Sequence, residues 1–158
     1  MKILHSYSWV VVLVLMTIAC AHDAKLVPLN LLEYGFPITI MAPDSPEIKT
    51  MDLVVQKDLT VKKGEDYYVQ IFMSDASTNK AGKVKAENLE ITKSNPYFSK
   101  LILDEDQGYI YEMKLDSAHT VYGFKYFKIQ GDKEFDFQTG LTGLFNEHQV
   151  RRMYEAVQ

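Results

Sequence analysis

Cysteine occurs only once in this chain of 158 residues, at Cys20. A single cysteine cannot form an internal disulfide or a zinc site built from several thiolates. Because Cys20 is the only cysteine, the chain that follows it offers no cysteine nucleophile. The folded region must therefore be stabilised by its hydrophobic core.

Histidine is also scarce, and its pattern predicts no metal site. The three histidines that follow Cys20 are in neither an H-x-H nor an H-x-x-x-H arrangement: His22, His119 and His148. Asp104-Glu105-Asp106 places three carboxylates in a row, but calcium loops space their ligands at alternate positions over about a dozen residues. We therefore predict no metal and no cofactor, and we interpret the three histidines as structural or solvated.

Sequence motifs of common catalytic and nucleotide-binding sites are missing as well. There is no G-x-S-x-G elbow, and the eight glycines form no phosphate-binding pattern. Acidic residues outnumber basic ones by 21 to 17, and the basic residues form no stripe, so a nucleic-acid partner is not expected. These absences favour a non-catalytic protein. The alternative is a cofactor-free hydrolase with a carboxylate or histidine site, because acidic groups distant in sequence can meet in a fold.

The first twenty residues have the organisation of a secretory signal peptide. Lys2 supplies a lone positive charge, and residues 9–18 form an apolar run too short to span a bilayer. The segment Thr17-Ile18-Ala19-Cys20 resembles the lipobox of bacterial lipoproteins, although Thr17 replaces the usual leucine. The resemblance implies cleavage before Cys20 and a diacylglyceryl group on its thiol. Ala19-Cys20-Ala21 also fits the A-x-A pattern of ordinary signal peptidase, whose cut would release a soluble protein.

These features divide the chain into three parts. We predict a signal peptide over residues 1–19, a lipidated tether over 20–30 and one α+β domain over 31–158, which is long enough for a single core. The expected location is the cell envelope, where the lipid attaches the domain to the outer membrane or the periplasmic face. Ala21 agrees with this location, since a residue other than aspartate after the cysteine resembles the outer-membrane default of some sorting systems.

Alternation of apolar and polar residues predicts strands along most of the domain. In the first half these are a strand at about 36–42, the apolar stretch 51–63, and a strand at 67–73. In the second half they are strands at 99–103, 109–115, 120–130 and 134–141. Short turns join several of these strands, so we expect an antiparallel meander.

Two segments have the pattern of amphipathic helices. Residues 78–94 are rich in Lys, Ala and Glu and stop at Asn95-Pro96. Near the end, Asn146 and Gln149 predict a capping box, with Phe145 packing on Val150 as a hydrophobic staple. The apolar residues that follow at helical spacing must lie on the sheet: Val150, Met153, Tyr154 and Val157. On the solvent side, Arg151 should pair with Glu155.

The order of three strands, a helix, four strands and a helix predicts an α+β fold. Its antiparallel sheet would have about six or seven strands covered by two helices. This order, with the early proline-containing segment and the closing helix, resembles the PsbP family fold, which the periplasmic DcrB-type lipoproteins share. The resemblance covers residues 36–158 and includes no diagnostic motif. It implies accessory work in the envelope, by analogy only.

Aromatic side chains alternate on two of the predicted strands, at Tyr109 and Tyr111 and at Tyr122, Phe124 and Tyr126. One interpretation is that these rings pack beneath the helices. If one face of the sheet is incompletely covered, they would instead bind a peptide, glycan or lipid. We therefore predict a non-catalytic envelope lipoprotein that is a binding or accessory module for a protein or small ligand. These five aromatic residues are its candidate ligand-binding residues.

Overall fold

The structure is a computed structural model that describes residues 24–158. The predicted signal peptide, residues 1–19, and the predicted lipidation site, Cys20, lie outside these residues. Within 24–158, each helix is too short or too polar to cross a membrane.

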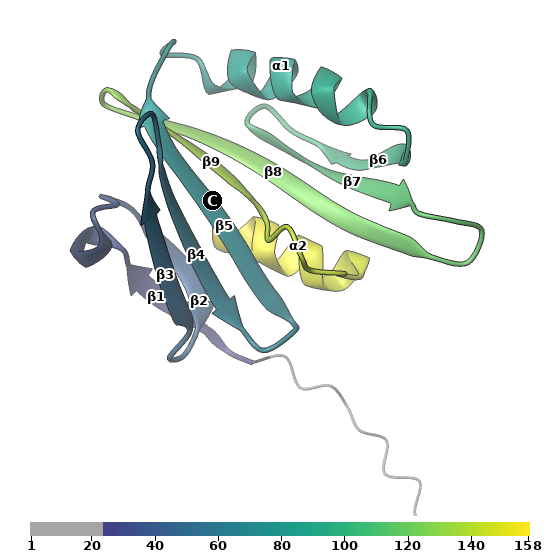
Figure 1. Ribbon diagram of the computed structural model, residues 1–158, viewed down its shortest axis with the longest axis horizontal. Helices are drawn as coiled ribbons and strands as arrows, with labels where there is room; N and C mark the ends of the chain where they lie inside the picture. The colour runs from purple at the N-terminus through teal and green to yellow at the C-terminus, as the bar shows by residue number, and fades with distance from the viewer. Residues whose placement is uncertain (1–23) are drawn as a thin grey trace, which may run out of the picture.

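Seven strands form one antiparallel sheet with the order β3-β4-β5-β9-β8-β7-β6 (Figure 1). Their bounds are β3 (Glu47–Asp52), β4 (Lys57–Lys63), β5 (Tyr67–Asp75), β6 (Phe98–Asp104), β7 (Gly108–Lys114), β8 (Thr120–Gln130) and β9 (Lys133–Thr139). Two helices, α1 (Ala81–Lys93) and α2 (Glu147–Ala156), pack against this sheet. The predicted α+β fold, with a sheet of about six or seven strands covered by two helices, is confirmed.

A second sheet contains only β1 (Leu26–Asn30) and β2 (Thr39–Pro43), which pair antiparallel and are separated by a short 3-10 helix (Leu32–Tyr34). The prediction that a tether extends to residue 30 is therefore wrong. Leu26 and Leu29 pack against the core. The sequence pattern did not predict β1 because Pro28 lacks a backbone N–H donor and argues against a strand. A strand at the edge of a sheet tolerates proline. The segment between Cys20 and the fold is shorter than predicted.

The pairing of the two halves also differs from a simple meander. Strands β6 to β9 do form a meander, but its last strand, β9, pairs with β5. Helix α1 carries the chain from β5 near the centre of the sheet to β6 at its edge (Figure 1). Turn residues indicate which consecutive strands are neighbours, whereas the contact between β5 and β9 is long-range and leaves no local signal.

The apolar stretch 51–63 is not one element, since β3 ends at Asp52 and β4 begins at Lys57. The backbone N–H of Leu53 donates to the Gln56 carbonyl at 2.9 Å and closes the tip of the hairpin. Val54 and Val55, which the alternation pattern placed in a strand, are exposed at this tip. The prediction failed there because it assumed that apolar residues are buried.

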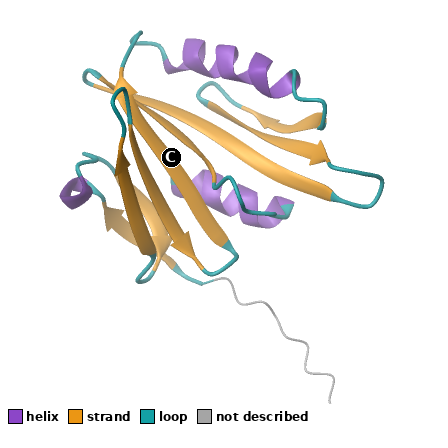
Figure 2. Cartoon of the chain, in the orientation of Figure 1, coloured by secondary structure: helices purple, strands orange, loops and turns teal. Residues whose placement is uncertain are grey.

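The helices lie on opposite faces of the seven-stranded sheet and form two cores (Figure 2). On one face, α2 and the β1–β2 sheet cover residues from β4, β5, β9 and β8. The predicted apolar side of α2 is buried there, as expected: Val150, Met153, Tyr154 and Val157. On the other face, α1 packs through Ala81, Val84 and Leu89 on Tyr109 and Phe127.

The predicted capping box of α2 is present in both directions. The Gln149 backbone N–H donates to Asn146 Oδ1 at 2.9 Å, and the Asn146 backbone N–H donates to Gln149 Oε1 at 2.9 Å. On the solvent side Arg151 pairs with Glu147 at 2.8 Å, so the predicted partner, Glu155, is corrected. Glu147 lies one turn before Arg151, in the favourable i to i+4 order of acid before base.

Replacing Asn146 with alanine should remove the side-chain acceptor of the Gln149 backbone N–H and lower the free energy of unfolding by about 1 kcal/mol. Serine at the same position retains a side-chain acceptor and should restore most of that loss. Urea denaturation of both variants measures the difference. Equal stability of the alanine and wild-type proteins would show that the cap contributes nothing.

Candidate functional site

Helix α1 covers only part of its face of the sheet, since it packs on β8 and β7. The strands beyond it on that side, β4, β5 and β9, carry mainly polar side chains. In one row across the sheet, Thr60 lies opposite Gln70, Gln70 opposite Gln138, and Gln138 opposite Lys125. Directly opposed residues share a face. We call this region the polar sheet face, and it comprises Asp58, Thr60, Gln70, Lys125, Asp136 and Gln138.

A chain of side-chain hydrogen bonds orders the polar sheet face. Gln138 Nε2 donates to Gln70 Oε1 at 3.4 Å, and Gln70 Nε2 donates to Asp58 Oδ2 at 2.8 Å. Gln70 is only 6% exposed, so its amide is fixed by these two partners rather than by bulk solvent. The chain therefore gives every amide in the row a defined orientation, as specific recognition of hydrogen-bonding groups requires.

Lys125 and Asp136 form a mostly buried ion pair at the edge of α1. Lys125 Nζ donates to Asp136 Oδ2 at 2.8 Å and to Asn88 Oδ1 of α1 at 3.3 Å. Burial raises the pKa of the Asp136 carboxyl, and the attraction of Lys125 offsets this only in part. Burial also raises the pKa of Glu134, with further contributions from Asp136 and Glu87.

The raised pKa of Asp136 predicts a pH dependence of stability. Between the ordinary pKa of aspartate, about 3.9, and the raised folded value, the folded state binds more protons than the unfolded state. The free energy of unfolding should therefore fall as the pH rises through this window. The Asp136→Asn variant has no carboxyl to titrate at this position, so its free energy of unfolding should fall less steeply with pH in this window. Urea denaturation at several pH values measures it, and parallel wild-type and variant curves would contradict the assignment.

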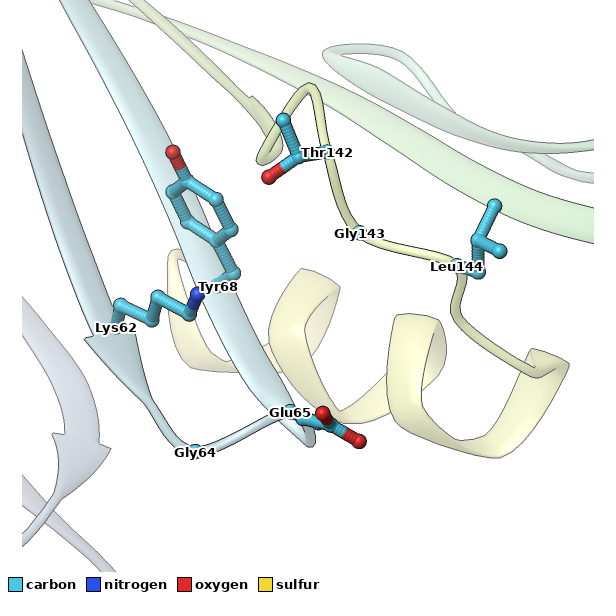
Figure 3. Close-up of a pocket in the computed structure, with 7 residues that line it drawn as sticks. All are labelled: Lys62, Gly64, Glu65, Tyr68, Thr142, Gly143 and Leu144. Atoms are coloured by element: carbon cyan, nitrogen blue, oxygen red, sulfur yellow. The ribbon is translucent and has the colours of Figure 1, made fainter.

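Two pockets open at one end of the polar sheet face, on either side of the loop that joins β9 to α2. The first has a volume of about 290 Å³ and is lined by Lys62, Gly64, Glu65, Tyr68, Thr142, Gly143 and Leu144 (Figure 3). The second, of about 280 Å³, shares Gly143 and Leu144 with the first. Gln138 also lines the second pocket, which therefore adjoins the polar sheet face.

Tyr68 is the central aromatic residue of the first pocket. Figure 3 shows its ring facing Thr142 across the pocket, and Lys62 Nζ lies 5.3 Å from the ring centroid. A Cβ atom at Gly140 would lie 2.3 Å from the Tyr68 ring, so only glycine fits beneath it. Sequence reasoning missed Tyr68 because its neighbour Tyr67 carried the apolar face of the predicted strand.

The five predicted ligand-binding aromatics do not form one surface. Phe124 and Tyr109 are fully buried, in the cores on opposite faces. The Tyr126 hydroxyl donates to Gln107 Oε1 at 3.1 Å, away from the two pockets. Tyr111 and Tyr122 both line the second pocket, and burial raises the pKa of Tyr111 to about 12, so its hydroxyl stays protonated. Of the five predicted aromatics, only Tyr111 and Tyr122 line a pocket of the candidate site.

Two polar pairs that resemble parts of catalytic sites lie elsewhere. His119 Nδ1 lies 2.7 Å from Asp116 Oδ2, so the histidine has a carboxylate partner that sequence reasoning missed. Both side chains are exposed in the loop between β7 and β8, outside the two pockets. Ser77 and Lys80 have the S-x-x-K spacing of some serine nucleophiles, but both residues are exposed in the loop before α1. Neither pair is enclosed as a reaction centre would be.

The acidic hairpin before Gly108 binds protein groups instead of gathering into a metal site. Asp104 pairs with Lys85 of α1, and Glu105 Oε2 accepts a hydrogen bond from the Tyr154 hydroxyl at 2.7 Å. Among residues 24–158, no three His, Asp or Glu side chains converge in a way that could hold a metal ion. These carboxylates therefore connect the hairpin to the two helices.

Comparisons with known protein families, with curated proteins and with solved structures find no match to this chain. The resemblance to the PsbP family stays a prediction. Any function assigned to the protein must be argued from its own residues.

Proposed function

We propose that this chain is a lipid-anchored, non-catalytic protein of the cell envelope, which binds a partner protein or small ligand. The binding surface is the polar sheet face together with the pocket around Tyr68. The observation that carries this proposal is the ordered chain from Gln138 through Gln70 to Asp58 on a part of the sheet beyond α1.

The composition of this surface supports binding. Burying amides and carboxylates costs free energy unless they are hydrogen-bonded. If this row served only to extend the core beneath α1, apolar side chains would do so without that cost. The row instead holds donors and acceptors in fixed directions beside an aromatic ring, Tyr68. Binding sites combine apolar contact area with a few placed polar groups in this way. The geometry suits a ligand that offers both hydrogen-bond donors and a flat apolar surface.

The anchoring part of the proposal rests on Cys20 and the lipobox-like segment before it. The first described residue, Ala24, follows Cys20 by four positions in the sequence. A lipid on Cys20 would therefore keep the polar sheet face close to one membrane and to the partners that reside there.

A site-specific crosslinking experiment tests the binding surface. A photo-crosslinking amino acid would replace Lys49, which lies opposite Thr60 at the edge of the polar sheet face. The control replaces Glu90 on the outer side of α1, since both side chains are 74% exposed. We expect a discrete adduct in intact envelopes from position 49 and none from position 90.

A second substitution shows whether that adduct depends on the polar sheet face. Thr60→Arg adds a bulky charge in the row beside Gln70 and should abolish the adduct at position 49. Identical adducts from positions 49 and 90, or an adduct unaffected by Thr60→Arg, would contradict the proposal.

A further inference from the structure

The loop between β9 and α2, residues 140–145, exposes two leucines to solvent. Leu141 is 78% exposed and Leu144 is 76% exposed. Leu115, in the loop between β7 and β8, is also exposed and lines the same pocket as these two residues. Exposed leucines gathered at one end of a small domain indicate a contact surface. We call Leu141 and Leu144 the leucine loop.

The described chain begins at this same end of the sheet. The carbonyl of Ala24 accepts a hydrogen bond from the guanidinium of Arg152. Ala24 lines a pocket with Gly64, and Gly64 also lines the pocket that contains Leu144. Figure 1 shows the start of the described chain near the turn between β4 and β5, at the end where the leucine loop lies.

Covalent geometry limits how far a lipid on Cys20 could lie from this end. Ala24 lies four positions after Cys20, and four fully extended residues span at most about 14 Å. If Cys20 carries the lipid, as the proposed function requires, the bilayer surface lies no further than this from Ala24. The end of the domain with the exposed leucines then faces the membrane.

We propose that Leu141 and Leu144 insert into the surface of the bilayer that anchors Cys20, an inference that rests on the proposed function. Charges around the turn between β4 and β5 are mixed, since Lys62 and Lys63 lie beside Glu65 and Asp66. The contact is therefore apolar rather than ionic, and it does not require anionic lipids. It places the pocket around Tyr68 at the membrane surface.

The hairpin tip between β3 and β4 provides an internal control. Val54 is fully exposed there, as Leu144 largely is. The tip and the turn next to Ala24 lie at opposite ends of β4, whose seven residues span about 23 Å. A residue at the tip should therefore stay in water when the leucine loop meets the bilayer.

Tryptophan fluorescence can measure this orientation directly. The only tryptophan, Trp9, lies in the predicted signal peptide, so the mature chain would contain none. We would express the full chain as Leu144→Trp, Leu141→Trp or Val54→Trp and isolate it from membranes. Each purified protein would be reconstituted into phosphatidylcholine vesicles with plain or brominated acyl chains. Far-UV circular dichroism would establish that the variants fold alike.

We expect the emission of tryptophan at position 144 or 141 to shift to shorter wavelength when the protein is in vesicles. Brominated acyl chains should quench most of the fluorescence intensity of these two variants. Val54→Trp should show neither change. Protein that floats with the vesicles but is not quenched at positions 141 and 144 would overturn the insertion and leave the lipid anchor intact. Shielding of these positions from aqueous acrylamide without bromine quenching would assign the leucines to a protein contact and also overturn it. Protein that does not float with the vesicles would overturn the proposed anchoring itself.

Discussion

Replacing Met153 with alanine is expected to lower the free energy of unfolding by about 2–5 kcal/mol. Met153 is fully buried between α2 and the sheet, and its Sδ accepts a hydrogen bond from the Tyr68 backbone N–H at 3.3 Å. Alanine would leave a cavity and remove that acceptor next to the candidate site. Chemical denaturation of the purified protein measures the loss.

Glu155→Ala is the matched control for Met153, because Glu155 lies on the exposed side of the same helix. It should change the free energy of unfolding by less than about 0.5 kcal/mol. A loss at Met153 no greater than that of the control would contradict the observed docking of α2.

Replacing Phe124 with alanine should be at least as severe, at about 3–5 kcal/mol. The Phe124 ring is fully buried and meets the Tyr154 ring edge to face, with centroids 5.9 Å apart. Such aromatic pairs stabilise beyond their buried area. Differential scanning calorimetry would detect the loss as a lowered Tm.

The Phe124 variant also separates two interpretations of the aromatic strand. If Phe124 were a solvent-accessible ligand-binding residue, its removal would change binding and leave Tm almost unchanged. Leu144→Ala serves as the comparison, since Leu144 is exposed and its loss should shift Tm very little. A Phe124 variant as stable as the Leu144 variant would contradict its place in the core.

Local patterns predicted the closing helix best. The capping box needs only Asn146 and Gln149, three positions apart, and the apolar spacing of Val150 and Met153 identifies the buried side. The four strands of the second half were placed equally well, because turn residues separate them. These elements follow from interactions between residues close in sequence.

Long-range pairing could not be inferred in the same way. The hydrogen bond between Gln70 and Gln138 joins residues 68 positions apart, and it exists only because β9 returns beside β5. In the sequence both glutamines look like solvated residues of half-exposed strands. The polar sheet face can therefore be identified only once the fold is known. The missed contact between Asp116 and His119 is local, and the sequence spacing alone could have indicated it.

Metabolic labelling with palmitate tests the lipid anchor on Cys20 most directly. Cells that express the full chain and a Cys20→Ala variant would be grown with labelled palmitate, and both proteins would be recovered from the membrane and soluble fractions. We expect label on the wild-type protein in the membrane fraction and none on the variant. An unlabelled, soluble wild-type protein whose mature chain begins at His22 would establish the A-x-A cut and contradict the anchor.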